Sequence, residues 1–205
     1  MLRKFIALAA VSLLFSATIM SAPVATVHAQ APAPGGMQPV SSPVGYQYQV
    51  PSSWQLIPNS LLERMGPQTF NVDGEAASQD GTLHTHVETA TNFGITTNDL
   101  SSVLSNFFSA PSASGASLNI FEGPSSVQVS GAEAALSGAA NYSDVDGTPR
   151  VVAARVALRG NSAYLLSLDV TQDFYTNDPA FGQILNSFQL TTPSASAFPT
   201  PLSGS

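Results

Sequence analysis

Residues 132–170 have the sequence AEAALSGAANYSDVDGTPRVVAARVALRGNSAYLLSLDV, in which apolar and polar side chains alternate in three successive runs. Such alternation is typical of β-strands, because successive side chains point to opposite sides of a sheet. Asp146-Gly147 and Gly160-Asn161-Ser162 separate the runs and have the residue types that tight hairpin turns require. The stretch therefore predicts an antiparallel meander with one buried face. The apolar side chains that share a face within each run are Ala132, Ala134, Leu136, Ala140 and Tyr142, then Val152, Ala154, Val156 and Leu158, then Tyr164, Leu166, Leu168 and Val170.

Amphipathic helices are predicted on either side of the meander in the chain. Residues 98–110 carry apolar side chains at helical spacing, with Asn98 as the N-cap and Pro111 at the stop. A second helix begins at Asp178-Pro179, an N-cap followed by proline at the first helical position. We expect both helices to cover the apolar face of the sheet, which makes the fold class α+β. The two apolar stripes are Leu100, Val103, Leu104, Phe107 and Phe108, and Phe181, Ile184, Leu185 and Phe188.

The remainder of the chain is expected to form a single domain with two tails. Further strands are predicted at Tyr46–Val50, Trp54–Pro58 and Leu83–Thr91, giving a sheet of about five to seven strands. A single α+β domain is expected over residues 44–190. It lies between a Pro/Ala/Gly-rich flexible spacer over residues 30–43 and a Ser/Pro/Thr-rich disordered tail over residues 191–205.

The first 29 residues have the three parts of a secretory signal peptide. Arg3 and Lys4 provide the positive charge, and an apolar stretch of 16 residues follows over Phe5–Met20. Val27-His28-Ala29 has suitable residues for a cleavage site. Because the apolar stretch is shorter than the roughly 20 residues that span a bilayer, cleavage is favoured over a retained anchor. We therefore expect a secreted or cell-envelope protein that begins at Gln30.

The composition excludes several classes of function. The chain has no cysteine, which excludes disulfides, thiolate zinc sites and cysteine nucleophiles. Without Arg3 and Lys4, four arginines remain against 13 acidic residues, so the mature net charge is −9. A chain this acidic is a poor partner for nucleic acid or anionic lipid. No P-loop, G-x-S-x-G, HExxH or dinucleotide-binding motif occurs, so no catalytic or cofactor-binding residue is predicted.

One constellation could carry chemistry. His84, His86 and Glu88 recur at the strand period of two, so all three project from the same side of their strand. Two imidazoles and a carboxylate could bind zinc, copper or nickel. The alternative is the polar, solvent-facing side of a half-buried strand, and the sequence favours this structural interpretation because two histidines at this spacing chelate weakly without a third well-placed ligand.

Trp54 and the arginines have structural explanations. Trp54 is the only tryptophan and lies beside a turn, where its large apolar surface would close the edge of the core. Arg155 and Arg159 alternate with the apolar side chains of their strand, and Arg150 lies near its start. We therefore expect the arginines on the solvent-facing side of the sheet.

Three segments resemble the PsbP-like superfamily. Tyr46–Trp54 has the pattern Y-x-Y-x-V-P-x-x-W, similar to the first strand and turn of that fold, and Gly131–Ala135 is similar to the start of a later strand. Ala163–Leu168 followed by the helix over Phe181–Phe188 is similar to the end of the fold. The resemblance covers about residues 45–190 and includes exported bacterial members such as the LpqN-type and proline-rich antigen proteins. It implies a small curved antiparallel sheet covered by helices, acting without catalysis.

The sequence therefore favours a secreted or cell-envelope binding or accessory module. Its partner is expected to be an envelope or extracellular protein or a small ligand, with no nucleic acid and no membrane span after cleavage. One alternative is a metal-binding protein or enzyme that uses His84, His86 and Glu88. A passive surface protein with a structural role is another.

Overall fold

The computed structural model describes residues 36–57, 71–91, 93–112 and 115–194. The predicted signal peptide over residues 1–29 lies outside the described residues, as do parts of both predicted tails. No helix in the described segments is long and apolar enough to cross a bilayer.

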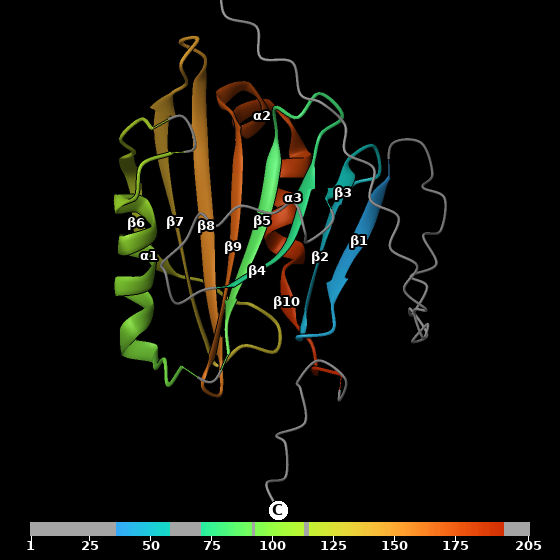
Figure 1. Ribbon diagram of the computed structural model, residues 1–205, viewed down its shortest axis with the longest axis vertical. Helices are drawn as coiled ribbons and strands as arrows, with labels where there is room; N and C mark the ends of the chain where they lie inside the picture. Colours follow the sequence, from blue (N-terminus) through green and yellow to red (C-terminus); the bar gives the residue numbers. More distant parts are fainter. Residues whose placement is uncertain (1–35, 58–70, 92, 113–114, 195–205) are drawn as a thin grey trace, which may run out of the picture. The chain divides into compact units, whose positions relative to one another are not determined.

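Seven strands form the larger sheet, and every neighbouring pair is antiparallel (Figure 1). Their order is β3-β4-β5-β9-β8-β7-β6. The three predicted runs are the adjacent strands β7, β8 and β9, joined by hairpin turns in which Gly147 has φ 84° and Gly160 has φ 57°. The predicted meander is confirmed. The strands are β3 (Gln55–Ile57), β4 (Asn71–Ala77), β5 (His84–Ala90), β6 (Asn119–Ser126), β7 (Ala134–Ser143), β8 (Pro149–Arg159) and β9 (Ser162–Thr171).

A second, three-stranded sheet has the order β1-β2-β10, formed by β1 (Met37–Ser42), β2 (Tyr46–Pro51) and β10 (Gln189–Leu190). β1 was expected to belong to the flexible spacer, and this part of the spacer prediction is wrong. β1 pairs with β2 along its whole length. The pairing uses backbone groups, which require no apolar periodicity, and Val40 is its one buried side chain. The start of the predicted tail is also ordered, because the Thr191 and Ser194 amides donate to the Gly45 and Pro43 carbonyls.

The central strands of the larger sheet, β5, β9, β8 and β7, are buried on both sides, which corrects the prediction of one buried face, whereas the edge strand β6 is exposed. The side of β8 that contains Val156 packs against α1 (Leu100–Ser109), whereas the side of β9 that contains Leu166 packs against the smaller sheet and α3 (Pro179–Ser187). The register explains this, because Val156 pairs with Leu165 and the apolar sets of the two strands point in opposite directions. Figure 1 shows α1 alongside β6 and β7, and α3 beside β2.

The arginines of β8 are correspondingly not solvent-facing. Arg155 lies under α3 with 8% exposure, and its Nη1 donates to the Leu185 carbonyl over 2.6 Å. Arg159 donates to the Gly45 and Thr191 carbonyls and to the Tyr164 hydroxyl. These arginines therefore join the sheet to α3 and to the smaller sheet.

The helix boundaries were partly predicted. Asp178 caps α3 as expected, with its Oδ1 accepting the Ala180 amide over 2.8 Å. Asn98 is not an N-cap. It lies in a 3₁₀ turn over Thr97–Asp99, where the Asp99 carboxylate accepts the Thr96 amide and hydroxyl. The sequence pattern also missed a third, short helix, α2 (Gln172–Asn177).

Gly131 provides a test of how the smaller sheet is attached. It has φ 77°, and a Cβ atom there would collide with the Leu190 carbonyl oxygen of β10. We expect Gly131→Ala to lower the free energy of unfolding by at least about 1 kcal/mol more than Gly147→Ala, because both incur the left-handed backbone cost but only Gly131 also meets a collision. Gly147 is the matched control, since it has φ 84° and open space around its Cα. Chemical denaturation with equal midpoints for the two variants would contradict this attachment.

Candidate functional site

His84, His86 and Glu88 share one side of β5, as predicted, but that side is not open to solvent. The side chains of His86 and Glu88 are only 4% and 1% exposed. His84 retains 35% exposure near the start of the strand. The expectation of a solvent-facing polar side is therefore wrong, because it assumed a sheet covered on one side only.

Glu75 of β4 joins the two histidines. Its Oε1 lies 3.1 Å from His84 Nδ1 and its Oε2 lies 3.6 Å from His86 Nδ1. His86 Nε2 lies 3.4 Å from Glu88 Oε1. We call Glu75, His84, His86 and Glu88 the histidine–carboxylate chain. Sequence reasoning missed Glu75, because β4 has the sequence NVDGEAA and shows no alternation that would place it opposite β5.

The pKa values in the histidine–carboxylate chain follow from burial and from opposite charges. Burial alone would raise the pKa of Glu75, but hydrogen bonds from His84 and His86 outweigh it and lower that pKa to about 2. The hydrogen bond to Glu75 raises the pKa of His84 against the effect of burial. Burial favours neutral His86, but Glu75 and Glu88 raise its pKa above the usual value. His84 Nε2 also lies 2.5 Å from the Gly81 carbonyl oxygen, so both ring nitrogens face acceptors and the imidazolium form is favoured.

The metal hypothesis gains no support from this arrangement. The imidazole nitrogens point at carboxylate and carbonyl oxygens of the protein rather than converging on one point. Within the described segments, no group of three or more His, Asp or Glu side chains is arranged to hold an ion.

A second buried polar cluster lies next to the histidine–carboxylate chain. Arg150 Nη2 lies 2.8 Å from Asp169 Oδ1, and Arg150 Nε donates to both Asp169 and the Tyr142 hydroxyl. The Tyr142 hydroxyl donates to Asp169 Oδ2 over 2.8 Å. Burial raises the pKa of Asp169 and that of Tyr142, while the Arg150 charge opposes both shifts. Asp169 pairs with His84 across β9 and β5, so the two clusters form a polar row across the sheet.

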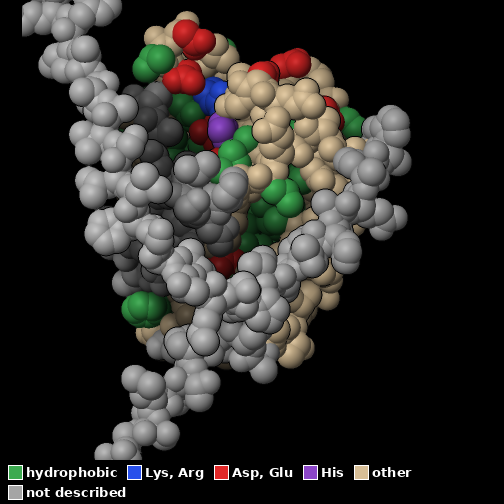
Figure 2. Space-filling model, turned by 45° about the vertical axis from the view of Figure 1, so that its right-hand side comes forward, with side chains coloured by type: hydrophobic (Ala, Val, Ile, Leu, Met, Phe, Trp, Pro, Cys, Tyr) green, Lys and Arg blue, Asp and Glu red, His purple; other side chains and the backbone are tan. Residues whose placement is uncertain are grey.

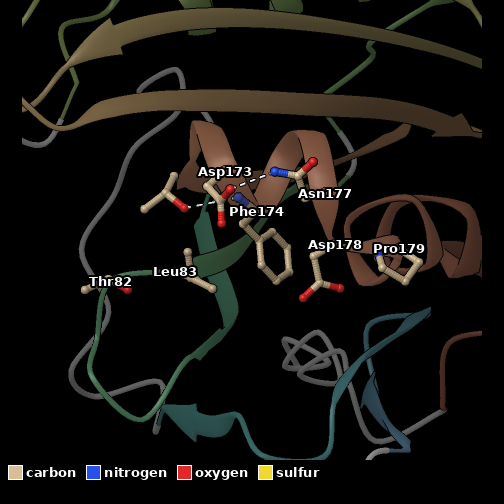
Figure 3. Close-up of a pocket in the computed structure, with 8 residues that line it drawn as sticks. Thr82, Leu83, Asp173, Phe174, Asn177, Asp178 and Pro179 are labelled. Atoms are coloured by element: carbon tan, nitrogen blue, oxygen red, sulfur yellow. Dashed lines mark hydrogen bonds between the residues drawn. The ribbon is translucent and has the colours of Figure 1, made fainter.

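A solvent-open pocket lies where β9 passes into α2 (Figure 3). Its volume is about 450 Å³. The Phe174 ring points into the space between Leu83 and Asp178 in Figure 3. Its lining residues come from the start of β5, from α2 and from the junction with α3: Thr82, Leu83, Thr171, Asp173, Phe174, Asn177, Asp178 and Pro179.

Trp54 packs against Phe174, one of the residues that line this pocket. It is 6% exposed, as expected for a residue that closes the edge of the core, and its ring lies 6.1 Å from the Phe174 ring, centroid to centroid. Thr171 Oγ1 accepts the Phe174 amide and caps α2. The aromatic wall is therefore fixed from two directions.

A second pocket of about 550 Å³ lies on the other side of α2. It shares Thr171, Asp173 and Asn177 with the first, so α2 separates two neighbouring hollows. The other residues that line it are Thr148, Pro149, Gln172 and Thr176.

Acidic side chains gather around these pockets. The strand register brings the β4–β5 turn, the β7–β8 turn and the end of β9 to the same end of the larger sheet. Figure 2 shows Asp and Glu side chains gathered at one end of the surface. The described carboxylates on these turns, on α2 and at the start of α3 are Asp80, Asp144, Asp146, Asp173 and Asp178.

No family model matches the sequence, and no curated protein sequence matches it either. Solved structures do. The solution structure of cyanobacterial PsbP (CyanoP) from Synechocystis sp. PCC 6803 matches with a TM-score of 0.55 at 13% identity, over 81% of this chain and 98% of that one. The chain has a PsbP-like fold.

Two further structures are similar over most of this chain. LpqN of Mycobacterium tuberculosis, described as involved in cell envelope biogenesis, has a TM-score of 0.45 at 17% identity, over 80% of this chain and 88% of its own. The Ran-binding protein Mog1p of Saccharomyces cerevisiae has a TM-score of 0.45 at 12% identity, over 80% of this chain and 100% of its own. At these identities the likeness to PsbP-like proteins concerns the fold, and no functional residue is carried over.

The histidine–carboxylate chain makes the stability depend on pH in a defined direction. The raised pKa values of His84 and His86 stabilise the fold below pH 6.5, and this contribution is lost as the pH rises through the folded-state values. The lowered pKa of Glu75 stabilises the fold above pH 4.5, and this contribution is lost as the pH falls towards about 2. These groups therefore contribute most between pH 4.5 and 6.5.

We expect His84→Gln/His86→Gln to lack the loss of stability above pH 6.5 that the parent protein shows. Thermal melts from pH 4 to 9 measure this. Asp169 is unchanged in both proteins, so its own titration largely cancels in the difference. Melting temperatures that fall in parallel between pH 6 and 9 would mean that the histidines do not titrate as described.

Proposed function

We propose that the protein is an extracytoplasmic, non-enzymatic binding module that holds its partner at the α2 end of the fold. The observation that carries the proposal is that the buried ionisable side chains lie apart from the solvent-open pockets. The ionisable groups best suited to catalysis are buried and paired with one another, whereas the two open pockets beside α2 contain no such pair.

The pocket linings favour binding over catalysis. Nucleophilic catalysis needs a nucleophile and a base within hydrogen-bonding reach of each other. Among the residues that the structure describes, no histidine lines either pocket. Asp173 and Asp178 each use one oxygen to hold local helix structure, through Asn177 and Ala180. The pockets offer a concave shape, apolar walls and negative charge, which are features of binding sites.

The N-terminal sequence supports the extracytoplasmic part of the proposal. Arg3 and Lys4, the apolar stretch over Phe5–Met20 and the cleavage site at Val27-His28-Ala29 match a secretory signal.

A matched pair of variants tests the binding site. Asn177→Arg fills the space between the two pockets with a long side chain, and Ser105→Arg makes the same change on the exposed side of α1. We expect crosslinking and pull-down from the native envelope to recover a specific partner with the parent protein and with Ser105→Arg, but not with Asn177→Arg. A peptide of residues 191–205 serves as the negative control. Equal recovery by the two arginine variants would place the partner elsewhere, and no specific recovery by the parent protein would favour a passive structural role.

The export step has its own measurement. Mass spectrometry of the protein from culture medium or envelope fractions should find an N-terminus at Gln30, as glutamine or as pyroglutamate. An intact Met1 in a membrane fraction would show that the signal segment is retained as an anchor.

A further inference from the structure

We propose that the pocket lined by Phe174, Asp173 and Asp178 receives a lysine or arginine side chain from a basic, extended segment of a partner protein. This inference rests on the proposed binding function and names the chemistry of its partner. The probe for it is a lysine peptide, as described below.

The walls of the pocket suit the aliphatic stem and the charged end of such a side chain. Leu83 and Pro179 provide apolar contacts for the methylene groups. The Phe174 ring points into the same space and is held by Trp54, so a cation placed over it would meet the ring without further rearrangement (Figure 3). A small apolar ligand would use these walls but would leave the carboxylates without a partner.

The two carboxylates have oxygens to spare. Asp173 Oδ1 accepts the Asn177 side-chain amide over 2.7 Å, and Asp178 Oδ1 accepts the Ala180 amide over 2.8 Å. In the described part of the chain, the second oxygen of each takes part in no hydrogen bond. Both residues are exposed and line the pocket.

The nearest arginine does not neutralise the pocket. Arg150 Nη2 donates to the carbonyl of Thr82, a lining residue, over 2.7 Å. Its charge is already paired with Asp169 in the buried cluster. Neither pocket is lined by a lysine or arginine among the described residues, so the net charge of the first pocket is negative. The whole chain carries a net charge of −7, which attracts cations over a longer range.

The second pocket argues for an extended segment rather than a free amine. Both hollows open to solvent and meet at Thr171, Asp173 and Asn177 across α2. A peptide that crosses α2 can place one side chain in each hollow, whereas a small amine occupies only one. Pro149 and the Thr148 and Thr176 side chains offer the second side chain a largely apolar surface.

An NMR titration of the ¹⁵N-labelled mature protein tests the inference. The probe is an acetylated and amidated pentapeptide with a lysine and a valine two positions apart, Ac-AKAVA-amide, compared with Ac-AEAVA-amide and with cadaverine as a free diamine. We expect the lysine peptide to cause saturable shifts at the amides of Thr82, Leu83 and Asn177. The glutamate peptide should cause none, and cadaverine should bind more weakly than the lysine peptide.

Charge removal at the pocket provides the decisive comparison. Asp173→Asn/Asp178→Asn keeps both side-chain shapes and an effective N-cap on α3 but removes two charges. We expect it to weaken binding of the lysine peptide by about 5-fold or more, as the loss of two exposed ion pairs implies. Glu122→Gln/Glu133→Gln removes the same charge outside both pockets and should change the affinity by less than about 2-fold. Phe174→Leu removes the aromatic ring but keeps an apolar contact with Trp54. It should also weaken binding of the lysine peptide, and it tests the pocket even if the double variant does not fold.

Three results would overturn the inference: no saturable shift with the lysine peptide, equal binding of the lysine and glutamate peptides, or equal effects of the two charge-removal variants. Cadaverine binding as tightly as the peptide would exclude an extended segment. If Asn177→Arg abolishes capture of the native partner but Asp173→Asn/Asp178→Asn does not, the binding function stands and this inference fails.

Discussion

Strands β8 and β9 run through the larger sheet with α1 packed on one side and the smaller sheet and α3 on the other, so most of their side chains have no access to water. A polar side chain on these strands must therefore find its partner inside the protein, because an unpaired buried charge is costly. Arg150 meets this constraint through its ion pair with Asp169. Arg155 meets it in part, because its Nη1 donates to the Leu185 carbonyl at the end of α3. The same constraint extends to β5, where the histidines are held against Glu75.

Because of this burial, the ionisable side chains of the polar row lie apart from the pockets that are open to solvent. The buried histidines and carboxylates with shifted pKa values, Glu75, His86 and Asp169, lie in the polar row across the sheet, where they join β4, β5, β8 and β9. The open hollows lie beside α2 at one end of the sheet and contain carboxylates, threonines and one aromatic ring. A perturbed pKa often indicates an active site, but ion pairs with a structural role perturb pKa values in the same way. In this protein the second explanation accounts for every contact described in the polar row.

The parts of the fold that sequence predicted are those with local signals. Gly147 and Gly160 mark the hairpins, and Asp178-Pro179 marks the start of α3. β1 was missed because it is held by backbone pairing and its Pro- and Ser-containing sequence has no alternation. The site was harder to predict. The shared side of His84, His86 and Glu88 follows from their spacing, but their burial and their pairing with Glu75 depend on residues distant in the chain. The pocket beside α2 depends on a short helix that has no clear apolar stripe.

The smaller sheet has a consequence for the order in which the chain can fold. β2 lies between β1, which precedes it directly, and β10, which ends at Leu190. Thr191 and Ser194 then bond back to the loop between β1 and β2. The hairpin of β1 and β2 therefore lacks its third strand until Gln189–Leu190 have been synthesised, and such long-range closure delays folding. A nascent chain that has not yet reached β10 leaves the second edge of β2 without its partner strand.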